Sequence, residues 1–147
     1  MATTSPTPPP EASSEPAPAL YPIVCDDDVV QFRHRVRAAA VAAGLRLIDQ
    51  TKLVTAASEL ARNALEHGGG GLGEISTPRT AGRTGVRLIV EDDGPGIEDT
   101  ALALTEGASR TRGMGMGLPG ARRLVDAFEL WSEVGVGTCV TVEKWAR

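Results

Sequence analysis

Glu59 and Asn63 stand four residues apart in the segment SELARNALEH, and this spacing places both side chains on one face of a helix. The apolar residues of the segment form a separate stripe, so the pair lies on its polar flank. A carboxylate and an amide oxygen are hard donors that suit Mg²⁺, and a carboxylate can also accept a hydroxyl proton. The pair is a candidate metal ligand and general base, and a solvent-exposed helix face is the alternative.

The second segment, VEDDGPGI, follows a run of apolar residues that is typical of a strand. Asp92, Gly94 and Gly96 form a D-x-G-x-G turn, in which glycine permits positive φ and a close approach of the backbone to a ligand. The Asp92 carboxylate can accept a hydrogen bond from an exocyclic amine such as N6 of adenine. Asp-Gly and Pro-Gly pairs are also frequent in ordinary turns, so an acidic surface turn is the alternative.

The third segment, RTRGMGMGLPG, places Gly113, Gly115 and Gly117 directly before an expected helix with Pro119 in its first turn. Free backbone amides and the helix dipole favour an anion such as a triphosphate at this point. A Walker A loop is excluded, because no Gly-Lys-Ser/Thr sequence occurs. The dinucleotide fingerprint G-x-G-x-x-G is met from Gly115 onward, but the strand that such a unit requires is not expected before it.

The elements that must position these segments follow from hydrophobic periodicity and from the positions of Asp, Gly and Pro. Pro22 favours an edge position for the first strand, because proline cannot donate to a β-ladder. The carboxylates of residues 26–28 begin the first helix and Gly44 ends it. The expected elements are a strand at 20–25, the helix ending at Gly44, a helix at 47–67, strands at 73–77 and 86–91, a short helix at 98–106, a helix at 118–127 and a hairpin with strands at 128–134 and 138–145.

This order lacks the alternation of strand and helix that builds a doubly wound parallel sheet. We therefore expect an α+β sandwich, with a mixed, mostly antiparallel sheet and helices on one face. The 147 residues, 41% of them hydrophobic, can bury one ordinary core, which predicts a single domain over residues 19–147. Residues 1–18 hold six of the ten prolines and predict a disordered tail.

Charge and composition exclude several classes of function. Acidic residues outnumber basic ones 19 to 15 without a dense Lys/Arg cluster, so no nucleic-acid partner is expected. No apolar run approaches the roughly 20 residues that span a bilayer, and the N-terminus lacks the features of a signal peptide. Cys25 and Cys139 have no metal-ligand spacing. We expect a cytoplasmic protein with no membrane segment, no zinc site and no disulfide.

The three segments together resemble the motifs of the Bergerat-fold (GHKL) ATPases, the superfamily of gyrase, Hsp90, the histidine kinases and MutL. SELARNALEH resembles its N box, DDGPGI its first glycine box and GMGMGL its second. The segment GMGMGLPGARRLVDAFELWSEVGVGTCVTVEKW further resembles the small serine/threonine switch kinases of bacterial sigma-factor regulation, and among them the RsbT type, which works with the stressosome. The resemblance covers residues 20–145 and implies a Bergerat-type sandwich that forms an ATP-binding kinase domain.

The resemblance implies roles in binding the base of ATP. Asp92 would accept the hydrogen bond of the adenine amine, and Gly94, Gly96 and Ile97 would shape the base pocket. Asp93 departs from the pattern, because many relatives carry Asn there. Its carboxylate adds a negative charge near the nucleotide and puts a direct contact with Mg²⁺ or water in doubt.

The resemblance also implies roles at the phosphates. Asn63 would ligate Mg²⁺, and Glu59 would be the catalytic base that orients or deprotonates a Ser/Thr hydroxyl. Gly113, Gly115 and Gly117 would supply phosphate-facing amides from a lid over the nucleotide, and Leu118 would also bind the nucleotide. Arg110 and Arg112, at the edge of this lid, could contact the transferring phosphate, a partner or only solvent.

The partners are likewise implied by the resemblance. A kinase of the RsbT type phosphorylates a STAS-domain antagonist protein in stress signalling and, in partner switching, activates a PP2C-type phosphatase by binding it. The alternative is an anti-sigma factor of the RsbW type, which binds a sigma factor directly. A catalytically silent nucleotide-binding switch is a third reading, against which Glu59 and Asn63 argue. The substrate, the signal and the oligomeric state stay open.

Overall fold

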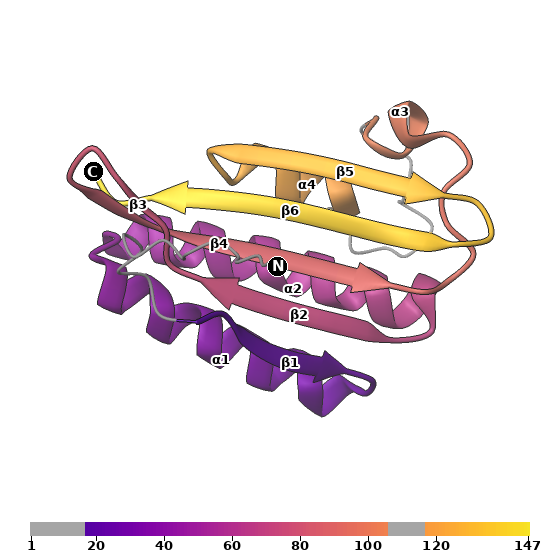
Figure 1. Ribbon diagram of the computed structural model, residues 1–147, viewed down its shortest axis with the longest axis horizontal. Helices are drawn as coiled ribbons and strands as arrows, with labels where there is room; N and C mark the ends of the chain where they lie inside the picture. Colours follow the sequence, from indigo (N-terminus) through magenta and orange to yellow (C-terminus); the bar gives the residue numbers. More distant parts are fainter. Residues whose placement is uncertain (1–16, 106–116) are drawn as a thin grey trace, which may run out of the picture.

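The computed structural model describes residues 17–105 and 117–147. Most of the expected tail and lid, including Gly113 and Gly115, therefore lie outside the described residues. A six-stranded sheet is packed against helices on one of its faces (Figure 1). This arrangement confirms the predicted α+β fold, and all pairings between the described strands are antiparallel. None of the described helices is long and apolar enough to cross a membrane.

The strands pair in the order β1-β2-β4-β6-β5, and the short β3 pairs with the start of β4. Strands β1 and β5 are the edges, so Pro22 of β1 lies at an edge as predicted. The elements in chain order are β1 (Ala19–Ile23), α1 (Asp26–Ala43), α2 (Leu47–Gly68), β2 (Gly71–Ser76), β3 (Arg79–Thr80), β4 (Arg83–Asp92), α3 (Thr100–Ala103), α4 (Gly117–Arg123), β5 (Ala127–Glu133) and β6 (Gly137–Trp145).

Helices α1 and α2 follow the sequence prediction closely. Gly44 ends α1 with a φ of +90°, a left-handed conformation that glycine adopts without strain. Helix α2 crosses the length of the sheet (Figure 1) and ends one residue after His67. Its buried stripe is rich in alanine, which lets the helix axis lie close to the sheet. The buried residues of this stripe are Leu53, Val54, Ala56, Ala57, Leu60, Ala61 and Ala64.

The predicted helix at 118–127 was wrong at its C-terminal end. Helix α4 ends at Arg123, because the backbone and the side chain of Asp126 form hydrogen bonds with β6. The Asp126 amide donates to the Glu143 carbonyl at 2.9 Å, and its carboxylate accepts from the Trp145 amide at 2.8 Å. These long-range bonds place residue 127 in β5. The sequence reading also missed β3, and the short helix expected at 98–106 is the single turn α3.

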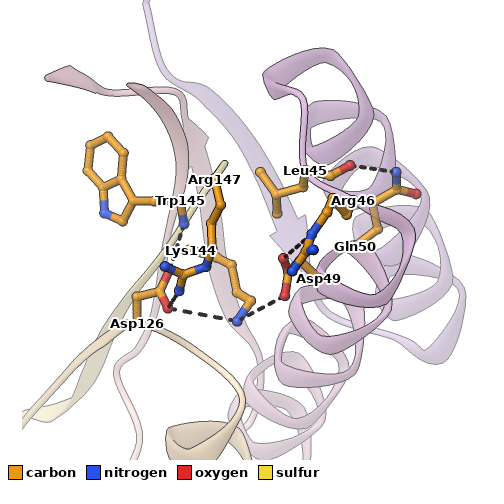
Figure 2. Close-up of polar contacts among 8 residues, drawn as sticks. All are labelled: Leu45, Arg46, Asp49, Gln50, Asp126, Lys144, Trp145 and Arg147. Carbon is orange, nitrogen blue, oxygen red and sulfur yellow. Dashed lines mark hydrogen bonds and ion pairs between the residues drawn. The ribbon is translucent and has the colours of Figure 1, made fainter. Parts of the chain in front are cut away.

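A buried ion pair joins the start of α2 to the end of β6 (Figure 2). Asp49 and Lys144 are each 5% exposed, and 3.6 Å separates Lys144 Nζ from Asp49 Oδ1. Arg46 lies 3.7 Å from the other oxygen of Asp49, and Asp126 lies 3.9 Å from Lys144 Nζ. Arg147 completes the cluster with a contact of 2.8 Å to Asp126. The C-terminal end of the chain is thereby tied to the first turn of α2.

Replacing Lys144 with Met should lower the free energy of unfolding by about 3 kcal/mol, because the Asp49 carboxylate stays buried without its cation. The double variant Asp49→Leu/Lys144→Met should recover most of this loss, because it removes both charges. Lys52→Met, at the half-buried second lysine, is the control and should change the value by less than about 0.5 kcal/mol. Urea denaturation measures all four proteins. A double variant as unstable as the single one would assign the loss to packing instead of charge.

Candidate active site

Asp92, at the end of β4, lies against the end of α2. Strand alternation directs its side chain to the helix side of the sheet, as it does for the buried Leu88 and Val90. A Cβ atom built on Gly68 would overlap the Asp92 carboxyl group, so only glycine fits at this last position of α2. Asp92 Oδ1 accepts a hydrogen bond of 2.8 Å from the Gly94 amide. The carboxylate is therefore held in place from two sides.

The surroundings of Asp92 also change its acidity. Burial raises the pKa of this carboxyl above its usual value of 3.8, and the negative charge of Asp93 adds to the rise. The backbone amides of Gly94 and Thr138 and the nearby His67 act in the opposite direction, but burial prevails. A partly desolvated carboxylate is a strong acceptor for a ligand N–H group, and such a perturbed group in a hollow is typical of a functional site.

The glycine turn after Asp92 is fixed between α2 and the β5–β6 hairpin. A Cβ on Gly94 would lie 2.5 Å from Cα of Gly68, and Gly96 has a φ of +81° beside the carbonyl of Glu133. The Ile97 amide donates to Ser132 Oγ at 2.7 Å. The predicted turn is confirmed, and the glycines permit close approach of backbone to backbone. Contact of Gly94, Gly96 and Ile97 with a nucleotide stays a prediction.

Thr138 is a site residue that the sequence reading missed. It faces Asp92 across the β4–β6 ladder, is 5% exposed, and its hydroxyl lies 2.8 Å from that of Ser132. The Ser132 hydroxyl links the same network to the Ile97 amide. The alternation that directs Val140 inward also directs Thr138 inward. A polar residue at an inward position of this strand was the sequence signal that could have indicated Thr138 as a site residue.

The second glycine box meets the N box through Glu59. Glu59 and Asn63 are half-buried on α2, and Glu59 Oε1 accepts a hydrogen bond of 3.1 Å from the Gly117 amide. This bond joins residues 58 positions apart. Because Gly68 lies on the same helix, α2 brings together parts of all three segments that the sequence singled out. The role of Asn63 as a metal ligand stays a prediction.

Leu118 behaves differently from the other predicted site residues. Its side chain is 5% exposed and belongs to the hydrophobic core, beside the fully buried Ala121 of the same helix. Ile97 is partly buried against the same core. The predicted contact of Leu118 with a nucleotide is untested, and in this structure its side chain anchors α4 to the core.

A hollow of about 440 Å³ opens beside Asp92. Its walls are the glycine-rich turn after α2 and the end of β4, with the lining residues Gly68–Leu72 and Glu91–Asp93. The volume is within the roughly 300–1,000 Å³ of small-molecule sites. The four glycines at 68–71 follow directly after the predicted helix at 47–67, and in the structure they form one wall of the hollow.

Two comparisons with known proteins agree with this geometry. Residues 48–146 match the family of histidine kinase-, DNA gyrase B- and HSP90-like ATPases, and the matched region contains α2 except its first residue, together with β4, α4 and the final hairpin. The chain is also 40% identical over 125 residues to a Bacillus subtilis protein named serine/threonine-protein kinase RsbT. That alignment covers 85% of this chain and 94% of the relative.

The Gly68–Asp92 contact gives a steric prediction. Gly68→Ala should displace the Asp92 carboxylate and weaken ATP binding by at least about tenfold, as expected when a charge-assisted hydrogen bond is lost. Gly82→Asn, at the turn before β4 and away from the hollow, is the matched control, because nothing lies within 4 Å of a Cβ there and Asn tolerates its φ of +78°. Calorimetric titration with ATP measures both. Wild-type affinity in Gly68→Ala would show that the close approach is dispensable for the ligand.

The raised pKa of Asp92 predicts opposite effects on stability and binding. Because the folded-state pKa lies above the unfolded one, the Asp92 contribution to stability is complete below the unfolded pKa and is lost as the pH rises through the folded pKa. At about pH 7, Asp92→Asn should therefore raise the Tm of the ligand-free protein, and this difference should shrink toward about pH 4. ATP affinity should fall by about 1.5–3 kcal/mol.

Thermal unfolding across this pH range and calorimetric titration of ATP test the two halves of the Asp92 prediction separately. A variant with a Tm below that of the wild type at neutral pH would contradict the assigned cost of burial. Unchanged ATP affinity in a folded Asp92→Asn protein would remove this carboxylate from the site.

Proposed function

The chain belongs to the family of histidine kinase-, DNA gyrase B- and HSP90-like ATPases, and we propose that this serine/threonine protein kinase transfers the γ-phosphate of ATP to a STAS-domain protein. The observation that supports this most is the convergence on α2: Glu59 meets Gly117 at the middle of the helix, and Gly68 meets Asp92 at its end. A base pocket and a phosphate pocket on one rigid helix suit phosphoryl transfer, which depends on positioning.

Asp92 would read the adenine base. Its fixed carboxylate would accept the hydrogen bond of the exocyclic amine, and this contact distinguishes adenine from guanine, which carries a carbonyl oxygen at the corresponding position. The bond from the Gly94 amide holds one carboxylate oxygen and leaves the other for the ligand. Thr138 and Ser132 would support this wall of the pocket through their paired hydroxyl groups.

Asn63 fits the role of a Mg²⁺ ligand. Magnesium in kinase sites binds one or two protein oxygens together with phosphate oxygens and water, so a single half-buried amide oxygen is a suitable contribution. Bound there, Mg²⁺ would neutralise the charge that develops on the phosphates. Asn63 lies one turn beyond Glu59 on α2, so the metal ligand and the base would face the same part of the nucleotide.

Glu59 would act on the protein substrate. The Gly117 amide holds Oε1 of its carboxylate, which restricts the side chain to one orientation. Oε2 would then orient the Ser or Thr hydroxyl of the substrate and take up its proton as the oxygen attacks the γ-phosphate. A base fixed by a backbone amide needs little reorganisation when the substrate arrives.

The proposed setting is partner switching in bacterial stress signalling in the cytoplasm. The similarity to a kinase named RsbT supports a STAS-domain substrate over a sigma factor as the first partner. Once the substrate is phosphorylated and released, the free kinase would bind a PP2C-type phosphatase. Direct capture of a sigma factor, the alternative, would need no transfer of phosphate.

The decisive experiment incubates the protein with Mg²⁺, ATP labelled at the γ-phosphate, and candidate STAS-domain proteins. Label on a Ser or Thr of the STAS protein is the expected result. A protein that binds ATP and a sigma factor but labels no STAS protein would instead be an anti-sigma factor.

Two substitutions on α2 should separate catalysis from binding. Glu59→Ala should slow phosphoryl transfer by roughly 10²–10⁴-fold and leave ATP affinity near the wild-type value, because the base acts on the substrate hydroxyl. Asn63→Ala should weaken Mg-ATP binding as well as turnover, because it removes a metal ligand. Thr51→Ala, at an exposed position of α2, is the control and should change neither. Similar transfer rates for Glu59→Ala and the wild type would withdraw the assignment of the base.

A further inference from the structure

One face of the sheet is covered by no described helix. Helices α1, α2 and α4 all pack on the other face, and Figure 1 looks directly onto the uncovered one. We call it the open face; it consists of the outward-pointing side chains of the strands. An open face of an antiparallel sheet is normally polar, because alternation sends apolar residues to the core. The side chains on this face depart from that rule.

Large apolar side chains lie on the half of the open face that is nearer to Asp92. Trp131 on β5 is 51% exposed, and Leu20 on β1 is 57% exposed. Leu72 and Ile89, on the strands between them, are half-buried. The exposed indole lies on edge strand β5 with Cys139 opposite it on β6, and the apolar residues of β4, β2 and β1 lie farther along the same face. A large exposed aromatic side chain is characteristic of interface centres, where its burial contributes most to affinity. This part of the open face therefore has the composition of an interface.

The same region is acidic. In the strand register Glu74 stands between Leu20 and Ile89, and Glu91 stands beside Leu72. Glu129 continues the row of Glu74 on β5, through Thr141. No ion pair to these three glutamates occurs among residues 17–105 and 117–147. Apolar and anionic side chains thus alternate along this row on β1, β2 and β4, and a further glutamate lies on β5.

The two arginines of the open face contact other residues than Glu74, Glu91 and Glu129. Arg87 binds Glu143 at 2.8 Å, and Arg83 lies over the ring of Trp145 with its Cζ 5.6 Å from the centroid. Both lie toward the end of β4 that is far from Asp92. The thiol of Cys139, on the same face, responds to the acidic surroundings: burial raises its pKa, and the charges of Glu91 and Glu74 raise it further. The negative potential of this region is therefore uncompensated by the arginines that share the face.

We propose that the open face around Trp131 is a docking surface for a partner protein segment in which Lys or Arg alternates with apolar residues. Such a segment would pair its cations with Glu74, Glu91 and Glu129 and bury the indole. Nucleic acids and anionic membranes would be repelled. A second copy placed face to face would set glutamates against glutamates. The surface lies on the opposite side of the sheet from α2, and the proposal does not depend on kinase activity.

The chain supplies its own reporter for this surface. Its two tryptophans, Trp131 and Trp145, both point to the open face, so tryptophan emission reports on it alone. The probe is an acetylated decapeptide of alternating arginine and valine, and the reference is the same peptide with glutamate in place of arginine. The arginine peptide should shift the emission to shorter wavelength in a saturable manner, and the glutamate peptide should leave it unchanged.

Charge-reversed variants test the location. Glu74→Lys/Glu129→Lys should weaken binding of the arginine peptide by at least about tenfold. Asp26→Lys/Asp27→Lys makes the same change of net charge in the helical layer, at the start of α1, and should keep the affinity within about twofold. Circular dichroism and Tm confirm that both variants are folded.

Four outcomes would overturn the proposal. The first is an emission that the arginine peptide does not change. The second is equal weakening in both charge-reversed variants, which would reduce the binding to attraction by net charge. The third is a wild-type dimer in sedimentation experiments that Trp131→Ala dissociates, which would make a second copy the occupant. Retained peptide affinity in Glu74→Lys/Glu129→Lys with a monomeric wild type would place the docking surface elsewhere.

Discussion

The contact between Gly68 and Asp92 is the constraint on which the candidate site depends. Without a Cβ on Gly68, the last turn of α2 can lie directly against the carboxylate that ends β4, and Gly94 can stack on the same backbone. This packing fixes α2 along its axis relative to the sheet. Glu59 and Asn63 therefore stand at defined distances from the Asp92 carboxylate, since a helix advances about 1.5 Å per residue.

The other end of α2 is fixed by a different kind of interaction. There Asp49, in the first turn of α2, forms a buried ion pair with Lys144 near the end of β6 (Figure 2). Asp126 links this pair to the chain between α4 and β5. A buried pair of this kind contributes little net stability compared with apolar residues, but a mispositioned partner is costly. It therefore favours one register of the helix on the sheet. The alanine-rich stripe between the two ends permits the close approach that both contacts need.

The alternation of side chains along β4 places two neighbouring carboxylates on opposite faces of the sheet. Asp92 and Glu91, its neighbour in sequence, both line the hollow, but Asp92 points to the helices and Glu91 points to the open face. The inner carboxylate is partly desolvated at a cost in stability, as its raised pKa indicates, and the outer one lies in an acidic surface.

The sequence by itself determined the features that depend on neighbours along the chain. Periodicity and glycine gave the ends of α1 and α2, proline placed β1 at an edge, and three short motifs indicated the family. Only the tertiary structure decided four features: the contact of Gly68 with Asp92, the position of Thr138 opposite Asp92, the bond between Glu59 and Gly117, and the early end of α4 at Arg123, before Asp126. Each of these rests on a contact between residues far apart in the chain, whose energy depends on distances that local propensity does not encode.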